Sequence, residues 1–223
     1  MWVNCSSTNI LFDCGEGAAK QLLRNKLDNN VIDSIVISHF HPDHVSGIFM
    51  VLQMFYLQKR KKTLNLYLPE KINEFKNFLD MFYTFTSRFS FKVNFKLTKN
   101  VNADHQQIHP IPSDHMQSYA GFVKKHSLPN ELLSYSFLIS DSGKKILYTS
   151  DFLDIKIYDK YLRKLDLIII DALHTKASDI IKFAEITNAR MILNHGLSEE
   201  LKNSLKTSIK KFEIADEKLE ISL

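Results

Sequence analysis

The sequence predicts an α/β (α+β) protein in which sheets and helices form a single domain over residues 1–223. Strand-like and helix-like segments alternate along the chain, and neither a repeat nor a low-complexity linker separates them. Hydrophobic residues make up 44% of the chain and charged residues 24%, which is typical of a folded globular protein and excludes a disordered one. A chain of 223 residues is long enough to bury a core of ordinary size.

Apolar residues in the first half of the chain recur with the periods of strands and helices. Residues 9–13 are a predicted strand, and residues 16–27 are a predicted helix because its alanine and leucine residues share one helical face. The predicted elements that follow are a strand at 33–38, a helix at 45–57, a strand at 63–68, a helix at 69–82 and a strand at 89–97. Aromatic residues are frequent from Phe75 to Phe91, and we expect them to pack in the core.

The second half of the chain predicts a hairpin followed by alternating strands and helices. Asp141-Ser142-Gly143 has the composition of a hairpin turn, so residues 134–140 and 145–149 are its predicted arms. The other predicted elements are an extended segment at 107–112, a strand at 167–170, a helix at 177–187, a strand at 191–193 and a helix at 198–212.

Charge and cysteine content narrow the functional classes. The net charge of +4 permits an anionic substrate but is weaker than the bias of most nucleic-acid-binding domains. Cys5 and Cys14 are the only cysteines, which excludes a disulfide framework and a cysteine-based zinc knuckle. The longest apolar stretch, residues 48–57, is shorter than the about 20 residues that a membrane helix needs. The first residues do not resemble a secretory signal, so we expect a cytoplasmic protein with no membrane partner.

A group of potential metal ligands follows the predicted strand at 33–38. Residues 39–44 read His-Phe-His-Pro-Asp-His. Because alternate side chains of a strand-end loop can splay apart, His39 and His41 can reach one ion while Asp43 and His44 turn toward a second. A single histidine in this place would more often belong to a solvated loop, but this spacing favours a metal site.

Three further potential ligands follow predicted strands later in the chain. His115 closes the extended segment at 107–112, Asp151 follows the strand at 145–149, and His195 follows the strand at 191–193. Ligands in sheet proteins usually project from strand ends. Each residue alone is ordinary, since a strand-end aspartate is more often a turn or helix cap. Their order after the first cluster supports a shared metal site.

These residues resemble the metallo-β-lactamase superfamily, whose HxHxDH motif matches residues 39–44. The resemblance extends from about residue 9 to the last residue. It implies a four-layer αββα sandwich with two divalent metal ions at one edge, zinc being the expected metal and manganese or iron the alternatives. It also implies that His39, His41 and His115 bind the first ion, that Asp43, His44 and His195 bind the second, and that Asp151 bridges the two.

Within this superfamily the sequence most resembles the RNase Z-like phosphodiesterases. Residues 12–17, Phe-Asp-Cys-Gly-Glu-Gly, and the helix start at 20–24 are similar to that branch's strand, glycine turn and helix. Asp13 is expected to hydrogen-bond the loop of potential ligands at 39–44, called the metal loop below. An equal alternative is that Asp13 serves only as a turn residue at the end of the strand. Cys14 is expected to be a small buried residue and not a ligand.

Two departures from this family affect the prediction. Members normally have one or two strands before the segment at 12–17, whereas residues 1–8 alone stand there in this sequence, so we expect part of the first strand to be missing. An exposed sheet edge there would favour a homodimer. The long substrate-gripping arm of tRNA-processing members is not evident, which favours a small phosphodiester over a precursor tRNA.

The resemblance implies hydrolysis of a phosphodiester by a hydroxide that the two metal ions hold. Asp43 is placed to orient this nucleophile. The resemblance also points to His174, just past the strand at 167–170, as the acid that protonates the leaving oxygen. A cap on the following helix is the alternative role of His174, and Asp171 could orient either this histidine or the metal ligands.

Other polar residues are less specific. The basic run at 59–62 could steer a polyanion, but a solvated helix end is the commoner reading of such a run. The segment at 119–126, with Tyr119 and Phe122, could touch substrate or form a packed surface loop. His105 and His109 are expected at the surface.

Three functions remain open. The first is a metal-dependent phosphodiesterase acting on RNA, a tRNA-like molecule or a small or cyclic nucleotide. The second is a hydrolase of a carbonyl substrate, such as a thioester, lactone or β-lactam, on the same metal centre. The third is an inactive binding module. The phosphodiesterase is favoured by Asp43 and His44 together with His174, and by the lack of a cysteine at a matched ligand position. The presence of every expected ligand disfavours the inactive module.

Overall fold

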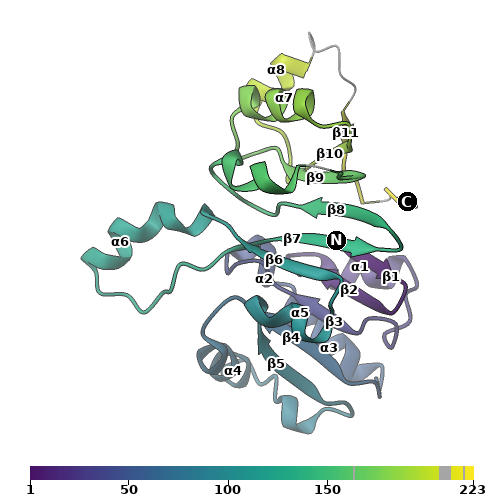
Figure 1. The fold of residues 1–223 in the computed structure, drawn as a ribbon. Coiled ribbons are helices and arrows are strands. Elements are labelled where there is room, and N and C mark those ends of the chain that lie inside the picture. Colours follow the sequence, from purple (N-terminus) through teal and green to yellow (C-terminus); the bar gives the residue numbers. More distant parts are fainter. Residues whose placement is uncertain (163, 206–211, 218) are drawn as a thin grey trace. The chain divides into compact units, whose positions relative to one another are not determined.

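The computed structural model describes residues 1–162, 164–205, 212–217 and 219–223, which divide into two compact units. The first unit comprises Met1–Gln106 and Leu128–Leu133, and the second comprises Gln107–Ser127 and Ser134–Leu223. Within the described residues, each unit contains one sheet together with its own helices (Figure 1).

The sheet of the first unit has the strand order β1-β2-β3-β4-β5. β1 runs antiparallel to β2 and all other neighbours are parallel, so β2 to β5 end at the same edge of the sheet. The strands are β1 (Trp2–Cys5), β2 (Thr8–Phe12), β3 (Ser34–Val36), β4 (Leu64–Leu68) and β5 (Val93–Leu97). The helices are α1 (Ala18–Arg24), α2 (Pro42–Val45), α3 (Ile48–Leu57), α4 (Ile72–Met81), η1 (Thr86–Arg88), η2 (Thr98–Asn100) and α5 (Val101–Asp104).

A strand that the hydrophobic pattern does not reveal lies at the edge of this sheet. Trp2–Cys5 form β1, in which Val3 pairs with Ile10, and Cys5 is the buried residue of the strand. Backbone pairing to β2 forms this strand, since its side chains are otherwise exposed or half-buried. We expected part of the first strand to be missing at this edge. The structure places β1 there, paired with the outer side of β2.

The core of the first unit combines the inner faces of β2, β3 and β4 with α1, α3 and α4. The expectation that the aromatic residues from Phe75 to Phe91 all belong to this core is only partly right. Phe75 and Phe91 are buried, but Phe78 and Phe82 are 44% and 56% exposed. On α4, positions 75 and 79 share the face toward the core, whereas positions 78 and 82 lie on the neighbouring face and pack around the ring of Phe49.

Arg60 corrects the reading of the basic run at 59–62. Its neighbours Lys59 and Lys61 are exposed, as a solvated helix end predicts, but Arg60 itself is fully buried. The guanidinium lies over the rings of Phe55 and Phe91. It also donates hydrogen bonds to the backbone carbonyls of Asn29, Ile32, Lys62 and Thr63. Arg60 therefore ties the loop before β3 to the loop before β4.

His105 is also buried, contrary to the expected surface position. The hydroxyl of Ser34 lies 2.8 Å from its Nε2 atom, so the ring has a polar partner inside the unit. Burial lowers the pKa of His105, which keeps the ring neutral at pH 7. His109 is exposed, as expected.

The sheet of the second unit has the order β11-β10-β9-β8-β7-β6. β6, β7 and β8 are antiparallel neighbours, and β8 to β11 are parallel. The strands are β6 (Ile108–Pro112), β7 (Tyr135–Asp141), β8 (Lys144–Tyr148), β9 (Leu167–Asp171), β10 (Arg190–Asn194) and β11 (Glu213–Ile214). The helices are η3 (His115–Tyr119), α6 (Ala120–Lys125), η4 (Ile155–Tyr161), α7 (Ala177–Ile186) and α8 (Glu199–Leu205).

In the second unit, the carboxyl ends of four strands lie at one edge of the sheet. Two antiparallel pairings separate β6 from β8, so both strands run the same way, and β9 and β10 run parallel to them. The carboxyl ends of β6, β8, β9 and β10 therefore meet at the same edge. The segment of η3 and α6 leaves β6 at this edge and extends away from the sheet (Figure 1).

The predicted elements agree with the observed ones to within a few residues at most ends. The predicted helix at 45–57 is divided into α2 and α3 by Ser46 and Gly47. The predicted helix at 198–212 is confirmed over Glu199–Leu205, and its residues 206–211 lie outside the described part of the chain. Across the described residues, no helix is long and apolar enough to cross a bilayer.

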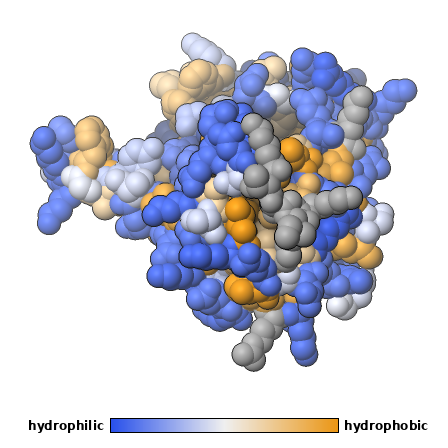
Figure 2. Space-filling model, turned by 90° about the horizontal axis from the view of Figure 1, so that it is seen from above, coloured by the Kyte–Doolittle hydropathy of each residue, from blue (hydrophilic) through white to orange (hydrophobic). Residues whose placement is uncertain are grey.

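The segment at 119–126 is not a packed loop. Tyr119 and Phe122 are 46% and 60% exposed. Figure 2 shows hydrophobic residues next to hydrophilic ones on the extended segment that carries α6. Both aromatic side chains therefore lie largely at the surface.

The burial of Arg60 leads to a stability prediction. Arg60→Ala should lower the free energy of unfolding by more than about 3 kcal/mol, because it removes the donor of four backbone carbonyl groups and the packing against two aromatic rings. Urea denaturation followed by circular dichroism measures this loss. Lys61→Ala, an exposed neighbour in the same basic run, should change it by less than about 0.5 kcal/mol. Equal effects of the two substitutions would contradict the assigned role of Arg60.

Candidate metal centre

The first unit gathers the four residues of the HxHxDH segment beyond the carboxyl end of β3. His39 and His44 are buried, and their ring centroids lie 4.1 Å apart. His39 Nε2 lies 3.1 Å from His41 Nδ1, and His44 Nε2 lies 3.5 Å from Asp43 Oδ2. Pro42 begins α2, so the chain turns into a helix directly after His41 and carries Asp43 and His44 around with it.

Two side chains orient the histidines of this loop. Ser38 Oγ lies 2.9 Å from His39 Nδ1, which directs Nε2 of His39 toward His41. Asp13 Oδ2 lies 3.0 Å from His44 Nδ1, which leaves Nε2 of His44 on the side of Asp43. A hydrogen bond at one ring nitrogen sets the tautomer and frees the other nitrogen for a metal ion. The predicted contact between Asp13 and the metal loop is confirmed, whereas the part of Ser38 has no signal in the sequence beyond its position next to His39.

The carboxylate of Asp13 is held by two donors. Its Oδ1 accepts a hydrogen bond of 2.8 Å from the backbone N–H of Ser38, in addition to the contact of Oδ2 with His44. Burial alone would raise the pKa of Asp13, but its contact with His44 and the hydrogen bond from the Ser38 N–H outweigh burial and hold the pKa well below its usual range. Asp13 is therefore an anion that fixes both ends of the metal loop.

Two glycines let the backbone of residues 14–15 lie against the metal loop. Cys14 donates its N–H to the carbonyl of His44, and Gly47 donates to the carbonyl of Cys14, both at 2.8 Å. A Cβ atom on Gly15 would stand 1.7 Å from the carbonyl oxygen of Asp43, and one on Gly47 would stand 2.0 Å from that of Gly15. Both glycines are thus required by close approach of two backbones.

Cys14 is buried at this contact, as expected. Burial raises the pKa of its thiol to about 12, so it stays protonated at neutral pH. A metal-binding cysteine must be a thiolate, and Cys14 is not one of the clustered donors.

The second unit gathers its predicted ligands at the edge where β6, β8 and β10 end. Asp151 is buried, and its Oδ2 lies 3.5 Å from His115 Nε2. Its Oδ1 lies 3.6 Å from His195 Nδ1. The carboxylate of Asp151 thus has a histidine nitrogen near each of its two oxygens.

Asp171 and His174 belong to the same cluster. Asp171 Oδ2 lies 3.0 Å from His174 Nδ1, and its Oδ1 accepts the backbone N–H groups of Leu173 and His174. The ring of His174 stacks on that of His195 with centroids 5.0 Å apart. One donor atom from each of Asp151, Asp171, His174 and His195 lies within 4.8 Å of the others.

The alternative role of His174 as a helix cap is wrong. The residue that precedes α7 is Lys176, and no side chain caps that end of the helix. The ring of His174 instead pairs with Asp171 and is 32% exposed. Its backbone loop bends back through the two hydrogen bonds to Asp171, which aims the side chain at the ligand cluster and away from α7.

The donors fit divalent transition-metal ions. Imidazole nitrogens and carboxylate oxygens are the ligands that zinc, manganese and iron accept in hydrolases. Two nitrogens that bind one tetrahedral zinc ion at about 2.0–2.1 Å stand about 3.3 Å apart, close to the spacing of His39 Nε2 and His41 Nδ1. The His and Asp clusters of the two units are therefore consistent with a two-metal centre.

The close approach at Gly47 gives a prediction. Gly47→Ala should lower the free energy of unfolding by about 1–3 kcal/mol or more, because the added Cβ forces residues 14–15 away from the metal loop. Gly121→Ala is the matched control, since a Cβ there meets no atom within 4 Å. Thermal unfolding of both variants measures the difference, and a Gly47→Ala protein as stable as Gly121→Ala would contradict the steric argument.

Three comparisons relate this chain to known proteins. Residues 1–218 match the family described as anti-Pycsar protein Apyc1. The chain is 30% identical over 136 residues to ribonuclease Z of Methanococcus aeolicus, a match that covers 60% of this chain and 38% of that enzyme. The chain thus spans about two fifths of the length of this curated relative.

Solved structures show the same fold. A diphosphatase of the PhnP family matches with a TM-score of 0.67 and 18% identity, over 100% of this chain and 83% of its own. The metallo-β-lactamase fold protein YhfI from Bacillus subtilis matches with a TM-score of 0.65 and 18% identity, over 96% and 86%. The predicted metallo-β-lactamase fold, a fold of metal-dependent hydrolases, is confirmed. Because the family match spans nearly the whole chain, this protein belongs to the family of the anti-Pycsar protein Apyc1.

Proposed function

We propose that this protein is a metal-dependent phosphodiesterase that hydrolyses cyclic nucleotides. The observation that carries the proposal is the pair of His and Asp clusters, one in each unit, which together contain every ligand that the sequence predicts. The membership of the Apyc1 family favours a cyclic nucleotide as the substrate. The short segment between β6 and β7 also favours a small phosphodiester over a tRNA.

In this proposal residues 1–223 are a single hydrolase domain that binds two divalent ions. His39, His41 and His115 hold the first ion, Asp43, His44 and His195 hold the second, and Asp151 bridges them. Zinc is the expected metal, with manganese and iron as alternatives. A homodimer formed through an exposed sheet edge remains a prediction.

The residues of the chain divide the reaction between them. Bound divalent ions would activate a water molecule for attack on phosphorus and neutralise the charge of the phosphate oxygens. Asp43, whose side chain is 57% exposed, orients the attacking water. Asp13 and Ser38 hold the histidines in the required tautomers.

His174 supplies the proton for the leaving oxygen. Asp171 occupies its Nδ1, so the proton to be donated stands on Nε2, on the opposite side of the ring. The carboxylate of Asp171 is buried and fixes the orientation of the His174 ring. The pair therefore resembles the carboxylate–histidine arrangement of many general acids, with Asp171 as the orienting group.

The first experiment is hydrolysis of 3′,5′-cyclic nucleotides by the purified full chain, with chelator and with added zinc or manganese. Turnover that requires the metal is expected, and Asp151→Ala should reduce it to background because it removes the bridging carboxylate. Asp159→Ala, an exposed aspartate of the same unit, should leave turnover unchanged. Hydrolysis of a thioester or lactone without phosphodiester cleavage would favour the carbonyl-hydrolase alternative, and binding without turnover would favour an inactive module.

Leaving-group dependence tests the role of His174. His174→Ala should slow the hydrolysis of a cyclic nucleotide by about 10²–10⁴-fold, because its alkoxide leaving group needs a proton. The same variant should slow bis-p-nitrophenyl phosphate much less, since nitrophenolate leaves without a proton. Steady-state kinetics on both substrates gives the comparison. Equal slowing of the two would assign His174 a structural role.

A further inference from the structure

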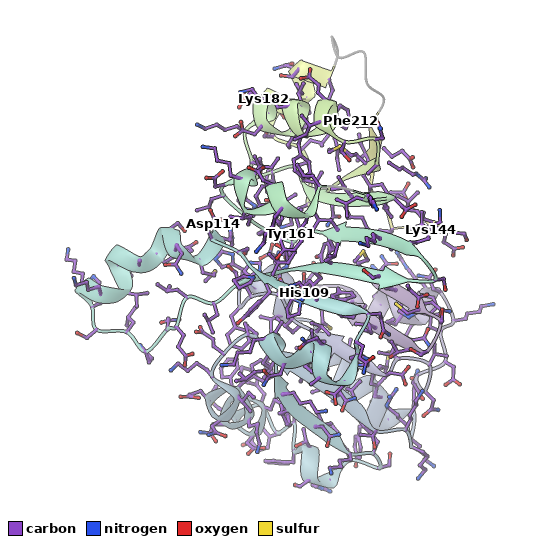
Figure 3. All side chains as sticks on the ribbon, viewed as in Figure 1. His109, Asp114, Lys144, Tyr161, Lys182 and Phe212 are labelled. Atoms are coloured by element: carbon purple, nitrogen blue, oxygen red, sulfur yellow. The ribbon has the colours of Figure 1, made fainter. Side chains whose placement is uncertain are left out.

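We propose that Asp114 is a positioning residue that holds the metal ligand Asp151 in register with the metal ligand His115. The inference rests on the proposed metal centre, but it concerns a residue outside the ligand set. Asp114 stands at the end of β6, directly before His115, and Figure 3 shows it where η3 begins. The ligand set that the resemblance implies does not include Asp114, and only the folded chain shows what its carboxylate contacts.

Asp114 binds the loop that follows Asp151 with both of its oxygens. Oδ1 accepts the backbone N–H of Leu153 at 2.8 Å, and Oδ2 accepts that of Asp154 at 2.9 Å. These two N–H groups lie two and three residues after Asp151. A carboxylate is the side chain suited to two adjacent donors, because both of its oxygens are acceptors.

Ser113 strengthens the same connection from the other side. Its hydroxyl lies 3.2 Å from the backbone carbonyl of Asp151, and its N–H donates to the carbonyl of Ser134 at 2.8 Å. The turn at 113–115 therefore holds the loop at 151–154 through the two hydrogen bonds that Asp114 accepts. The Ser113 hydroxyl, which donates to Ser134 Oγ at 2.8 Å, adds only a longer contact. Neither Ser113 nor Asp114 is one of the clustered donors.

This connection controls the distance between two ligands that come from different strands. His115 and Asp151 are 36 positions apart in the sequence and follow β6 and β8, which are not neighbours because β7 lies between them. His115 Nε2 nevertheless lies 3.5 Å from Asp151 Oδ2. Metal ligands must hold their positions to within about 0.5 Å, and backbone hydrogen bonds beside both ligands supply that rigidity.

The chain offers a matched control for Asp114. Asp166 also uses both carboxylate oxygens to join two segments of the second unit, accepting the N–H of Lys145 at 2.9 Å and the ammonium of Lys144 at 3.1 Å. It stands just before β9, at the end of the sheet opposite to the ligands. Asp114 and Lys144 accordingly mark opposite ends of this sheet in Figure 3.

The test measures metal binding by the full chain. Zinc affinity by competition with a chromophoric chelator, and the visible spectrum of the cobalt-substituted protein, are compared among wild type, Asp114→Asn, Asp114→Ala and Asp166→Ala. We expect Asp114→Ala to weaken zinc binding by about 10–100-fold and to alter the cobalt spectrum, with Asp114→Asn intermediate because one acceptor oxygen remains. Asp166→Ala should retain the zinc affinity and the cobalt spectrum of the wild type, even if its melting temperature falls as far as that of Asp114→Ala.

The outcomes separate this inference from the proposed function. Wild-type affinity and an unchanged cobalt spectrum in Asp114→Ala would overturn the positioning role while leaving the phosphodiesterase proposal intact. An equal loss in Asp166→Ala would also overturn it, because the effect would then be general destabilisation. A wild-type protein that binds metal without hydrolysing any phosphodiester would refute the proposed function but not the role of Asp114. A wild type that binds no divalent ion would refute both.

Discussion

The hydrogen bonds of the Asp13 carboxylate are the interaction on which the first unit's part of the metal centre depends. This one anion accepts the N–H of Ser38 at one end of the metal loop and faces the ring of His44 at the other. The loop can close on Asp13 only because Gly15 and Gly47 allow the two backbones to touch. The tautomer of His44, the conformation of the loop and the burial of Cys14 follow from this contact.

The second unit repeats the same physical solution with other residues. Asp171 accepts two backbone N–H groups of its own loop and orients the ring of His174, and Asp114 accepts two from the loop beyond Asp151. In each case a carboxylate outside the expected ligand set satisfies backbone donors beside a ligand. These contacts lie in the loops beyond the strand ends, where the chain would otherwise be free to move. The carboxylates therefore restrict the loops that carry the ligands and leave the sheet itself unchanged.

Strand direction explains why residues far apart in the chain gather at these loops. In the first unit, parallel β2 and β3 place Asp13 and the metal loop at the same edge. In the second unit, β6, β8, β9 and β10 all run the same way, so His115, Asp151, Asp171 and His195 emerge together. In each unit the expected ligands therefore come from the ends of strands, which the sheet holds in place.

The sequence by itself determined most of the strands and helices, the HxHxDH loop and the strand-end positions of the expected ligands, because apolar periodicity and ligand spacing are local properties. Tertiary structure alone decided what depends on partners distant in the chain. Trp2–Cys5 become a strand through pairing with β2. Arg60 is buried because four backbone carbonyl groups accept its hydrogen bonds. Phe78 and Phe82 are exposed because they do not lie on the face of α4 that packs on the core. His174 meets Asp171 and His195, and Asp114 meets the loop after Asp151, only once the parallel strands have brought their ends together.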